Sequence, residues 1–224
     1  EADSPGLDHI AFKVENEEDL AKYEKKIEQF GCTLKRVSKG TRIAEGEAIR
    51  FELPTGHQVE LYHKIERVGT KTGDWNPHPW PDGLRGIAPH RLDHLALTGD
   101  DIDTVTRFFT EVLDMFVSEK ITTVDGEQMV GSFIYARNGK PHDVAFIKGP
   151  DKKMHHVAFY VDNWYDVLKA ADILSKNNVQ FDVTPTRHGI TRGQTTYFFD
   201  PSGNRNEAFA SGYITYPDFP TITW

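Results

Sequence analysis

The chain has 224 residues, of which 38% are hydrophobic and 12% aromatic, which is enough apolar material for a folded protein with one large domain or two small ones. Its formal net charge of −8, without a stripe of basic residues, argues against a nucleic-acid partner, because a phosphate backbone would be repelled. The single cysteine, Cys32, excludes an internal disulfide framework and favours a reducing, cytoplasmic location. The sequence contains neither a long apolar run nor an export signal pattern, so we expect no membrane association.

The first predicted unit covers residues 9–62. It opens with a short apolar run, HIAF, which predicts a strand, and a polar ENEED stretch follows where a helix would start. After the helix, three further apolar runs predict strands: CTLKRV, AIRFEL and VELY. The pattern therefore predicts a βαβββ unit. Residues 63–89 are rich in Pro, Gly and Trp and lack periodicity, so we interpret them as a linker.

The same unit recurs twice after the linker. LDHLAL at 92–97 matches LDHIAF at 7–12 and opens a second copy, although its later spacing is looser. The third copy aligns with the first at a constant offset and without a gap, with HVAFYVDNWYDVLK over HIAFKVENEEDLAK and FFDPSGNRNEAF over FELPTGHQVELY. Its helix is predicted at DVLKAADILSKN and its later strands at VQFDV, TTYFF and EAFA. These repeats predict an α+β fold made of βαβββ units.

Equivalent positions of the repeats carry metal-ligand side chains. Each opening strand has a histidine at the same place, and the closing strands of the first and third copies each have a glutamate. If the second and third copies pair into one domain, His94, His156 and Glu207 converge, because equivalent strand positions face the same point. Two imidazoles and one carboxylate form the facial triad that suits non-haem Fe(II), and a metal would also pair the buried charge of Glu207. The alternative interpretation is isolated strand histidines with ordinary hydrogen bonds.

Two neighbouring histidines must be told apart in the third copy. Only His156 lies in register with His94, because LDHLAL superposes on MHHVAF at the second histidine. We expect His155 to face the other way and to have a surface or structural role.

Three motifs carry a resemblance to a known family: HDVAFI at 142–147, HHVAF at 155–159 and PTRHGITRGQTTYFFDPSGNRNE at 185–207. On these the chain resembles the type I extradiol dioxygenases of the vicinal oxygen chelate superfamily, and within them the catechol 2,3-dioxygenase group. The family signature is met by a histidine, a tyrosine, an Asp-Pro-x-Gly turn and a glutamate, at His188, Tyr197, Asp200, Pro201, Gly203 and Glu207. Thr196 departs from the aliphatic residue that the signature asks for.

The resemblance implies a role for each matching residue. The iron ligands fall on His94, His156 and Glu207, the set that the repeats also select. The acid/base histidine falls on His142, and the hydrogen-bonding partners of the substrate fall on His188 and Tyr197. The implied reaction opens catechol, or a simple substituted catechol, with O2 to a 2-hydroxymuconic semialdehyde in aromatic degradation. The family also implies a homo-oligomer, a tetramer.

In this family four βαβββ units pair into two partly open barrels. By that resemblance residues 1–62 are a partial N-terminal domain whose first unit is missing, and residues 90–224 are the catalytic domain with the start of a C-terminal tail. His9 and Glu60 repeat the ligand types, but Thr41 and Arg50 stand where the third copy has His188 and Tyr197. We therefore interpret His9 and Glu60 as a vestigial or structural site.

Two other functions stay open on this scaffold. One is a glyoxalase- or epimerase-like metalloenzyme, which usually needs more carboxylate ligands. The other is a metal-free module that binds a small aromatic molecule. The choice between Fe(II) and Mn(II) also stays open, because both accept this ligand set.

Overall fold

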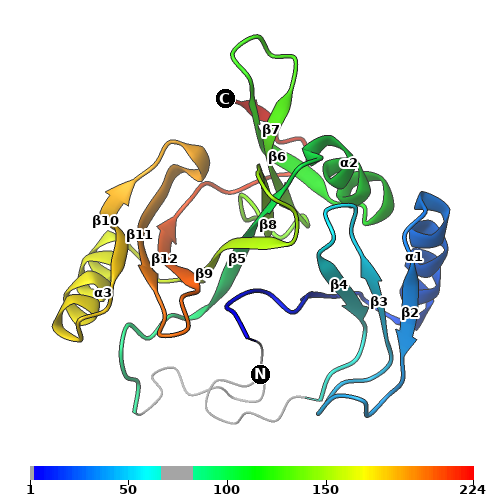
Figure 1. Ribbon diagram of the computed structural model, residues 1–224, viewed down its shortest axis with the longest axis horizontal. Coiled ribbons are helices and arrows are strands. Elements are labelled where there is room, and N and C mark those ends of the chain that lie inside the picture. The colour runs from blue at the N-terminus through cyan, green and yellow to red at the C-terminus, as the bar shows by residue number, and fades with distance from the viewer. Residues whose placement is uncertain (1–2, 67–82) are drawn as a thin grey trace. The chain divides into compact units, whose positions relative to one another are not determined.

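The computed structural model describes residues 3–66 and 83–224 and divides the chain into two compact units (Figure 1). The smaller unit is Asp8–Arg85, and the larger unit combines Glu1–Leu7 with Gly86–Trp224. The start of the chain thus groups with the larger unit, whereas the predicted boundary kept residues 1–62 together. Most of the predicted linker, at 67–82, lies outside the described residues.

The smaller unit is one βαβββ repeat, as predicted. Its elements are β1 (Ile10–Lys13), α1 (Glu17–Phe30), β2 (Leu34–Val37), β3 (Ala48–Glu52) and β4 (Gln58–Tyr62). The strands form a sheet in the order β1-β4-β3-β2, with β1 parallel to β4 and the other neighbours antiparallel.

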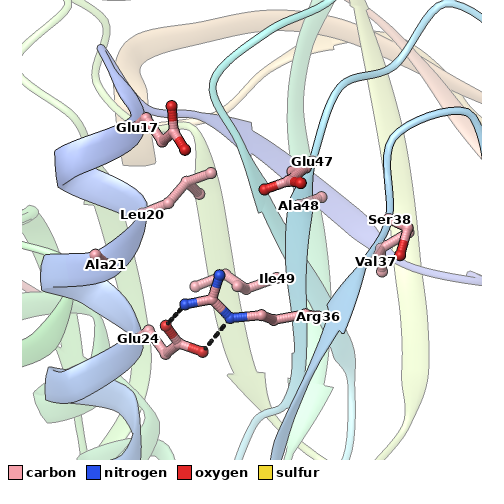
Figure 2. Close-up of a pocket in the computed structure, with 10 residues that line it drawn as sticks. All are labelled: Glu17, Leu20, Ala21, Glu24, Arg36, Val37, Ser38, Glu47, Ala48 and Ile49. Atoms are coloured by element: carbon pink, nitrogen blue, oxygen red, sulfur yellow. Dashed lines mark hydrogen bonds and ion pairs between the residues drawn. The ribbon is translucent and has the colours of Figure 1, made fainter.

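Helix α1 begins and ends at residues with clear local causes. The Asn16 side chain accepts a hydrogen bond from the Asp19 amide, and three acidic residues in the first turn favour the helix dipole. Gly31 ends the helix at φ 96°, a left-handed conformation that favours glycine. Leu20 and Ile27 are the buried residues of this helix. Glu24 holds Arg36 of β2 through two hydrogen bonds (Figure 2).

A cavity of about 350 Å³ remains between α1 and the sheet. Glu17 and Glu47 lie at its rim, and Leu20 and Ile49 line it with apolar surface (Figure 2). Its charged side chains are paired or solvated, so it is a packing gap of the smaller unit.

The larger unit contains the second and third repeats and one nine-stranded sheet. The second repeat consists of β5 (Arg91–Gly99), α2 (Ile102–Arg107), a π-helical turn (Phe108–Val112), β6 (Phe116–Thr122), β7 (Met129–Tyr135) and β8 (Val144–Lys148). The third consists of β9 (Lys153–Tyr160), α3 (Trp164–Lys176), β10 (Phe181–Arg187), a 3-10 turn (Ile190–Arg192), β11 (Gly193–Phe199) and β12 (Arg205–Ser211). A short strand, β13 (Ile222–Thr223), follows.

The strand order explains how the two repeats pair. It runs β10-β11-β12-β9-β5-β8-β7-β6-β13, so each half repeats the order of the smaller unit. The opening strands β5 and β9 join the halves as antiparallel neighbours, and β5 is parallel to β8 as β9 is to β12. The sheet keeps two free ends and is open. This confirms the predicted α+β fold and the pairing of the second and third repeats.

The core of the larger unit lies mainly between its helices and the sheet. The second-repeat helix and π turn bury apolar side chains against β7 and β8, and α3 does the same against β10 to β12. Near the junction of β5 and β9 the sheet carries small residues, with Ala96 and Ala145 packed beside Phe133. Small side chains there leave space beside the central strands. Within the described ranges, no helix is both long and apolar enough to cross a lipid bilayer.

Candidate metal centre

Three neighbouring strands bring the predicted ligands together. His94 is on β5, His156 on β9 and Glu207 on β12, and all three side chains are buried. His94 Nε2 lies 3.0 Å from Glu207 Oε2, and His156 Nε2 lies 3.1 Å from the same oxygen. The two Nε2 atoms are 3.2 Å apart. The pairing of repeats thus produces the convergence that the sequence predicts.

These spacings fit the face of an octahedral metal ion. Adjacent ligands of such an ion lie about 3.0 Å apart when each ligand distance is about 2.1 Å, whereas tetrahedral ligands would lie about 3.4 Å apart. Glu207 Oε2 is buried and has no hydrogen-bond partner among the described residues, although two ring nitrogens lie close to it. An orphaned buried carboxylate oxygen costs free energy unless a cation pairs with it. The residues therefore fit a divalent metal ion.

Thr195 and Asp93 orient two of the ligands. The Thr195 hydroxyl donates a hydrogen bond to Glu207 Oε1, which leaves Oε2 free to face the two imidazoles. Asp93 Oδ2 lies 2.9 Å from His94 Nδ1, so that nitrogen carries the proton and Nε2 presents a lone pair. Burial alone would raise the pKa of Asp93, but hydrogen bonds from His94 and Arg91 lower it.

The pKa of Glu207 lies well below its usual value. Burial would raise this pKa, but the imidazoles of His156, His188 and His94 outweigh it. The carboxylate is therefore charged and available to a cation.

His155 does not face away from the site, so the prediction of its orientation is wrong. It lines the cavity beside the ligands, and its Nδ1 lies 2.8 Å from His156 Nδ1. The cause is a bulge: Ala96 pairs with His156 and Leu97 with Met154, so His155 has no partner on β5 and the alternation of faces breaks. Burial, followed by the charges of His156 and Arg205, lowers the pKa of His155 to about 4.

A second bulge lies opposite, at Asp93. Leu92 pairs with Phe159 and His94 with Ala158, so Asp93 is the extra residue of β5. Asp93 and His94 are both buried and belong to the continuous buried stretch 93–97 of β5.

A cavity of about 150 Å³ lies beside the three ligands, and the other predicted site residues line it together with two of the ligands. His94, His142, His156, His188 and Tyr197 all line it, and its apolar wall comes from Ala96, Phe133, Ala145, Ile147 and Ile190. The structure therefore brings all six predicted residues to one place.

His142 is buried against His94, with ring centroids 4.0 Å apart. Its Nδ1 has no hydrogen-bond partner in the part of the chain that the structure describes. Burial, followed by the neighbouring His94, lowers its pKa well below the usual value. The ring is therefore neutral, and its Nδ1 is not committed to another group.

His188 and Tyr197 flank Glu207. His188 Nδ1 donates to the Ile190 carbonyl, and Nε2 lies 3.9 Å from Glu207 Oε1. Burial lowers the pKa of His188, but the interaction with Glu207 and the Ile190 carbonyl raise it overall. Tyr197 pairs directly across β11 and β12 with Glu207, and burial and that carboxylate raise the pKa of its phenol, which stays protonated.

Gly193 makes room for this arrangement. A Cβ at this position would lie 2.5 Å from His188 Cε1 and 2.6 Å from Phe209 Cε2, so only glycine fits. The sequence carries a signal for it, because Gly46 occupies the same place in the first repeat. A signal also existed for Asp93, since an Asp-His pair opens both LDHIAF and LDHLAL. For Thr195 the sequence offers no such signal.

Comparison with known proteins gives consistent matches. The Glyoxalase/Bleomycin resistance protein/Dioxygenase superfamily matches residues 91–208, and the catechol 2,3-dioxygenase-like N-terminal domain matches residues 7–66. The chain is 42% identical to metapyrocatechase of Pseudomonas sp. (strain CF600), across all of this chain and 73% of that protein. It is 31% identical to a manganese-dependent 2,3-dihydroxybiphenyl 1,2-dioxygenase of Geobacillus genomosp. 3, across 97% of this chain and 71% of the relative.

The solved structures that resemble this chain are also dioxygenases. The 2,3-dioxygenase LapB from Pseudomonas sp. KL28 superposes with a TM-score of 0.94 at 42% identity, covering 100% of this chain and 78% of that one. A variant of homoprotocatechuate 2,3-dioxygenase from Brevibacterium fuscum gives a TM-score of 0.88 at 28% identity, covering 100% of this chain and 60% of the other.

Proposed function

The chain belongs to the glyoxalase/bleomycin resistance protein/dioxygenase superfamily, and we propose that it is an extradiol dioxygenase that opens the ring of a catechol with O2. The observation that carries this proposal is the trio His94 Nε2, His156 Nε2 and Glu207 Oε2, which fits one face of an octahedral ion beside a cavity. Three protein ligands on one face leave three positions for reactants. The product would be a 2-hydroxymuconic semialdehyde.

The resident metal we propose is Fe(II). When bound, the ion would hold both catechol oxygens and O2 side by side and pass electrons between them. Mn(II) is the alternative, because it accepts the same ligands and one relative is named as manganese-dependent.

The size and polarity of the cavity support a substrate with one ring. A cavity of about 150 Å³ is the size that accepts a benzene-sized molecule, and the apolar side chains of Phe133, Ile147 and Ile190 suit the faces of such a ring. The small side chains of Ala96 and Ala145 create this space.

His142 is the acid/base group in this proposal. A neutral imidazole in the cavity can take the second catechol proton and return it later in the reaction. The lowered pKa of His142, caused by burial and then by His94, keeps the ring neutral until substrate arrives.

His188 and Tyr197 would stabilise the charge that develops on oxygen. The raised pKa of Tyr197, caused by burial and Glu207, keeps its hydroxyl protonated and able to donate. The Ile190 carbonyl fixes His188 at Nδ1, so Nε2 is the atom that remains for substrate.

Anaerobic loading followed by addition of catechol tests the proposal. We expect oxygen uptake and a yellow ring-cleavage product with Fe(II), and comparison with Mn(II) loading decides the metal. His156→Ala and Glu207→Ala variants should lose both metal and product, whereas His9→Ala, the equivalent change in the first repeat, should lose neither. Stoichiometric metal without oxygen uptake would favour a glyoxalase- or epimerase-like enzyme, and catechol binding without metal would favour a binding module.

The assembly and location stay predictions. We propose a homo-oligomer, a tetramer, in the cytoplasm, and sedimentation analysis of the purified protein measures the first of these directly.

A further inference from the structure

Glu119 is a fully buried carboxylate outside the metal centre. It lies on β6, and its side chain is among the largest completely buried ones in the described part of the chain. A carboxylate in such a place is stable only when donors satisfy its oxygens.

Three donors from distant segments meet on this carboxylate. Oε1 accepts a hydrogen bond from the Thr191 amide at 2.7 Å and another from the Tyr213 hydroxyl at 2.5 Å. Oε2 accepts one from the Trp224 indole nitrogen. Burial, followed by Glu119 itself, raises the pKa of Tyr213, so the phenol stays protonated and donates. Hydrogen bonds to a charged acceptor are strong and directional, so Glu119 ties these segments to β6.

The segment held through Thr191 has a strained backbone. Thr191 and Arg192 adopt φ values of 55° and 53°, in the left-handed region that non-glycine residues rarely occupy and β-branched residues least of all. Such a conformation persists only when its surroundings fix it. The Thr191 amide is fixed by Glu119, and the Trp224 ring packs against Gly189, where a Cβ would lie 3.0 Å from it.

The same turn carries His188. The Ile190 carbonyl accepts the hydrogen bond from His188 Nδ1, and Ile190 and Thr191 also line the cavity. A path of direct contacts therefore runs from Glu119 through Thr191 and Ile190 to His188.

We infer that Glu119 is a positioning residue: it holds the strained 189–192 turn in the conformation that aims His188 Nε2 at the cavity. The predicted effect of Glu119 on catalysis rests on the proposed function, whereas its predicted effect on the position of His188 does not.

A double-mutant cycle tests the catalytic effect. Glu119→Gln keeps the size of the side chain but turns an amide toward the donors, so kcat for catechol should fall roughly 10- to 100-fold, as for other outer partners of active-site groups. Metal content and KM should stay close to those of the parent. In a His188→Gln background the same change should cost less than twofold, because the group that it positions is gone. Losses that multiply in the double variant would overturn the inference.

Two further variants keep the test decisive. Glu127→Gln alters an exposed glutamate of the β6–β7 hairpin and should leave kcat unchanged. Trp224→Phe removes one donor and keeps an aromatic ring, so it should lower kcat less than Glu119→Gln and should also lose its effect in the His188→Gln background. If Glu119→Gln does not fold, Trp224→Phe decides by the same cycle.

A spectroscopic measurement separates this inference from the proposed reaction. In metal-free protein labelled with ¹⁵N-histidine, the His188 ring should carry its proton at Nδ1 at mildly alkaline pH, and Glu119→Gln should shift the tautomer balance. An unchanged His188 signal in that variant would overturn the inference even in an active enzyme. A shifted signal supports it even if the parent protein does not cleave catechol.

Discussion

The first and third repeats place a buried glutamate at the same position of the fold, but the two glutamates have different partners. In both, a buried glutamate lies on the closing strand and pairs directly with one residue of the preceding strand: Glu60 with Arg50, and Glu207 with Tyr197. In the smaller unit Arg50 Nη2 lies 3.0 Å from Glu60 Oε2, and Arg42 Nη1 lies 3.3 Å from Oε1. In the larger unit Glu207 Oε2 has two imidazole nitrogens beside it, and among the described residues no guanidinium pairs with it.

The difference teaches that the cross-strand partner decides whether a buried carboxylate can hold a metal. Two arginines neutralise Glu60 from within the chain, and Arg42 also contacts His9 Nε2 at 2.7 Å, so the metal-ligand atoms are already occupied. This supports the interpretation of His9 and Glu60 as a structural site. At Glu207 a bound metal ion would supply the positive partner.

Removing both imidazoles of the metal centre gives the largest expected effect. In a His94→Ala, His156→Ala double variant we expect metal content to fall to background, because one carboxylate alone cannot hold the ion at the protein concentration of the assay. Elemental analysis after loading and desalting checks this. Stoichiometric metal in that variant would overturn the assignment of His94 and His156 as ligands, and its loss on a further His9→Ala change would place the site in the first repeat.

Tyr197→Arg recreates the first-repeat chemistry in the third repeat. The guanidinium would pair with Glu207 as Arg50 pairs with Glu60, so metal and ring cleavage should be lost while the metal-free protein stays as stable as the parent or becomes more so. Elemental analysis and thermal melting with a chelator measure the two effects. Tyr197→Phe is the matched control: it should keep the metal and lower only kcat. Retention of metal by the arginine variant would show that the cross-strand partner is not decisive.

Glu60→Ala tests whether the buried glutamate of the first repeat serves stability and not metal binding. It leaves Arg50 and Arg42 without their buried partner, so the free energy of unfolding should fall by about 3 kcal/mol, the lower end of the range for a broken buried pair. The lower end applies because the Arg42 side chain is 33% exposed. Denaturant unfolding of metal-free protein measures the loss, and metal content should not change. A neutral effect on stability would mean that the arginines are solvated without Glu60.

Asp93→Asn should give the smallest effect of the series. Asp93 fixes the tautomer of His94, and the loss of such an outer partner typically weakens metal affinity roughly 10- to 100-fold. Competition with a fluorescent chelator measures it. The control is Asp8→Asn: Asp8 precedes His9 as Asp93 precedes His94, but its side chain is 80% exposed, so affinity should not change. Equal losses in both variants would point to a general charge effect.

The repeat made much of this predictable from sequence. An ungapped alignment fixes strand register, and register decides which side chains share a face, so His94, His156 and Glu207 could be selected before any coordinates were known. The family motifs then identified His142, His188 and Tyr197.

The features that could not be predicted from the sequence share a physical reason. Bulges at Asp93 and His155 insert one residue without disturbing the apolar pattern, so alternation predicted the wrong face for His155. The π-helical turn at Phe108–Val112 likewise has the apolar spacing of an ordinary helix. The role of Thr195 depends on which oxygen of Glu207 it reaches, a detail that three-dimensional packing alone decides.

The seam between β5 and β9 has a consequence for folding. One ligand comes from the second repeat and two come from the third, so neither repeat alone can bind the ion with three groups. Any free energy gained on metal binding is therefore available only to the state in which the two repeats are paired. An ion bound by these three residues would therefore stabilise the two repeats in their paired state and favour their unfolding as one cooperative unit.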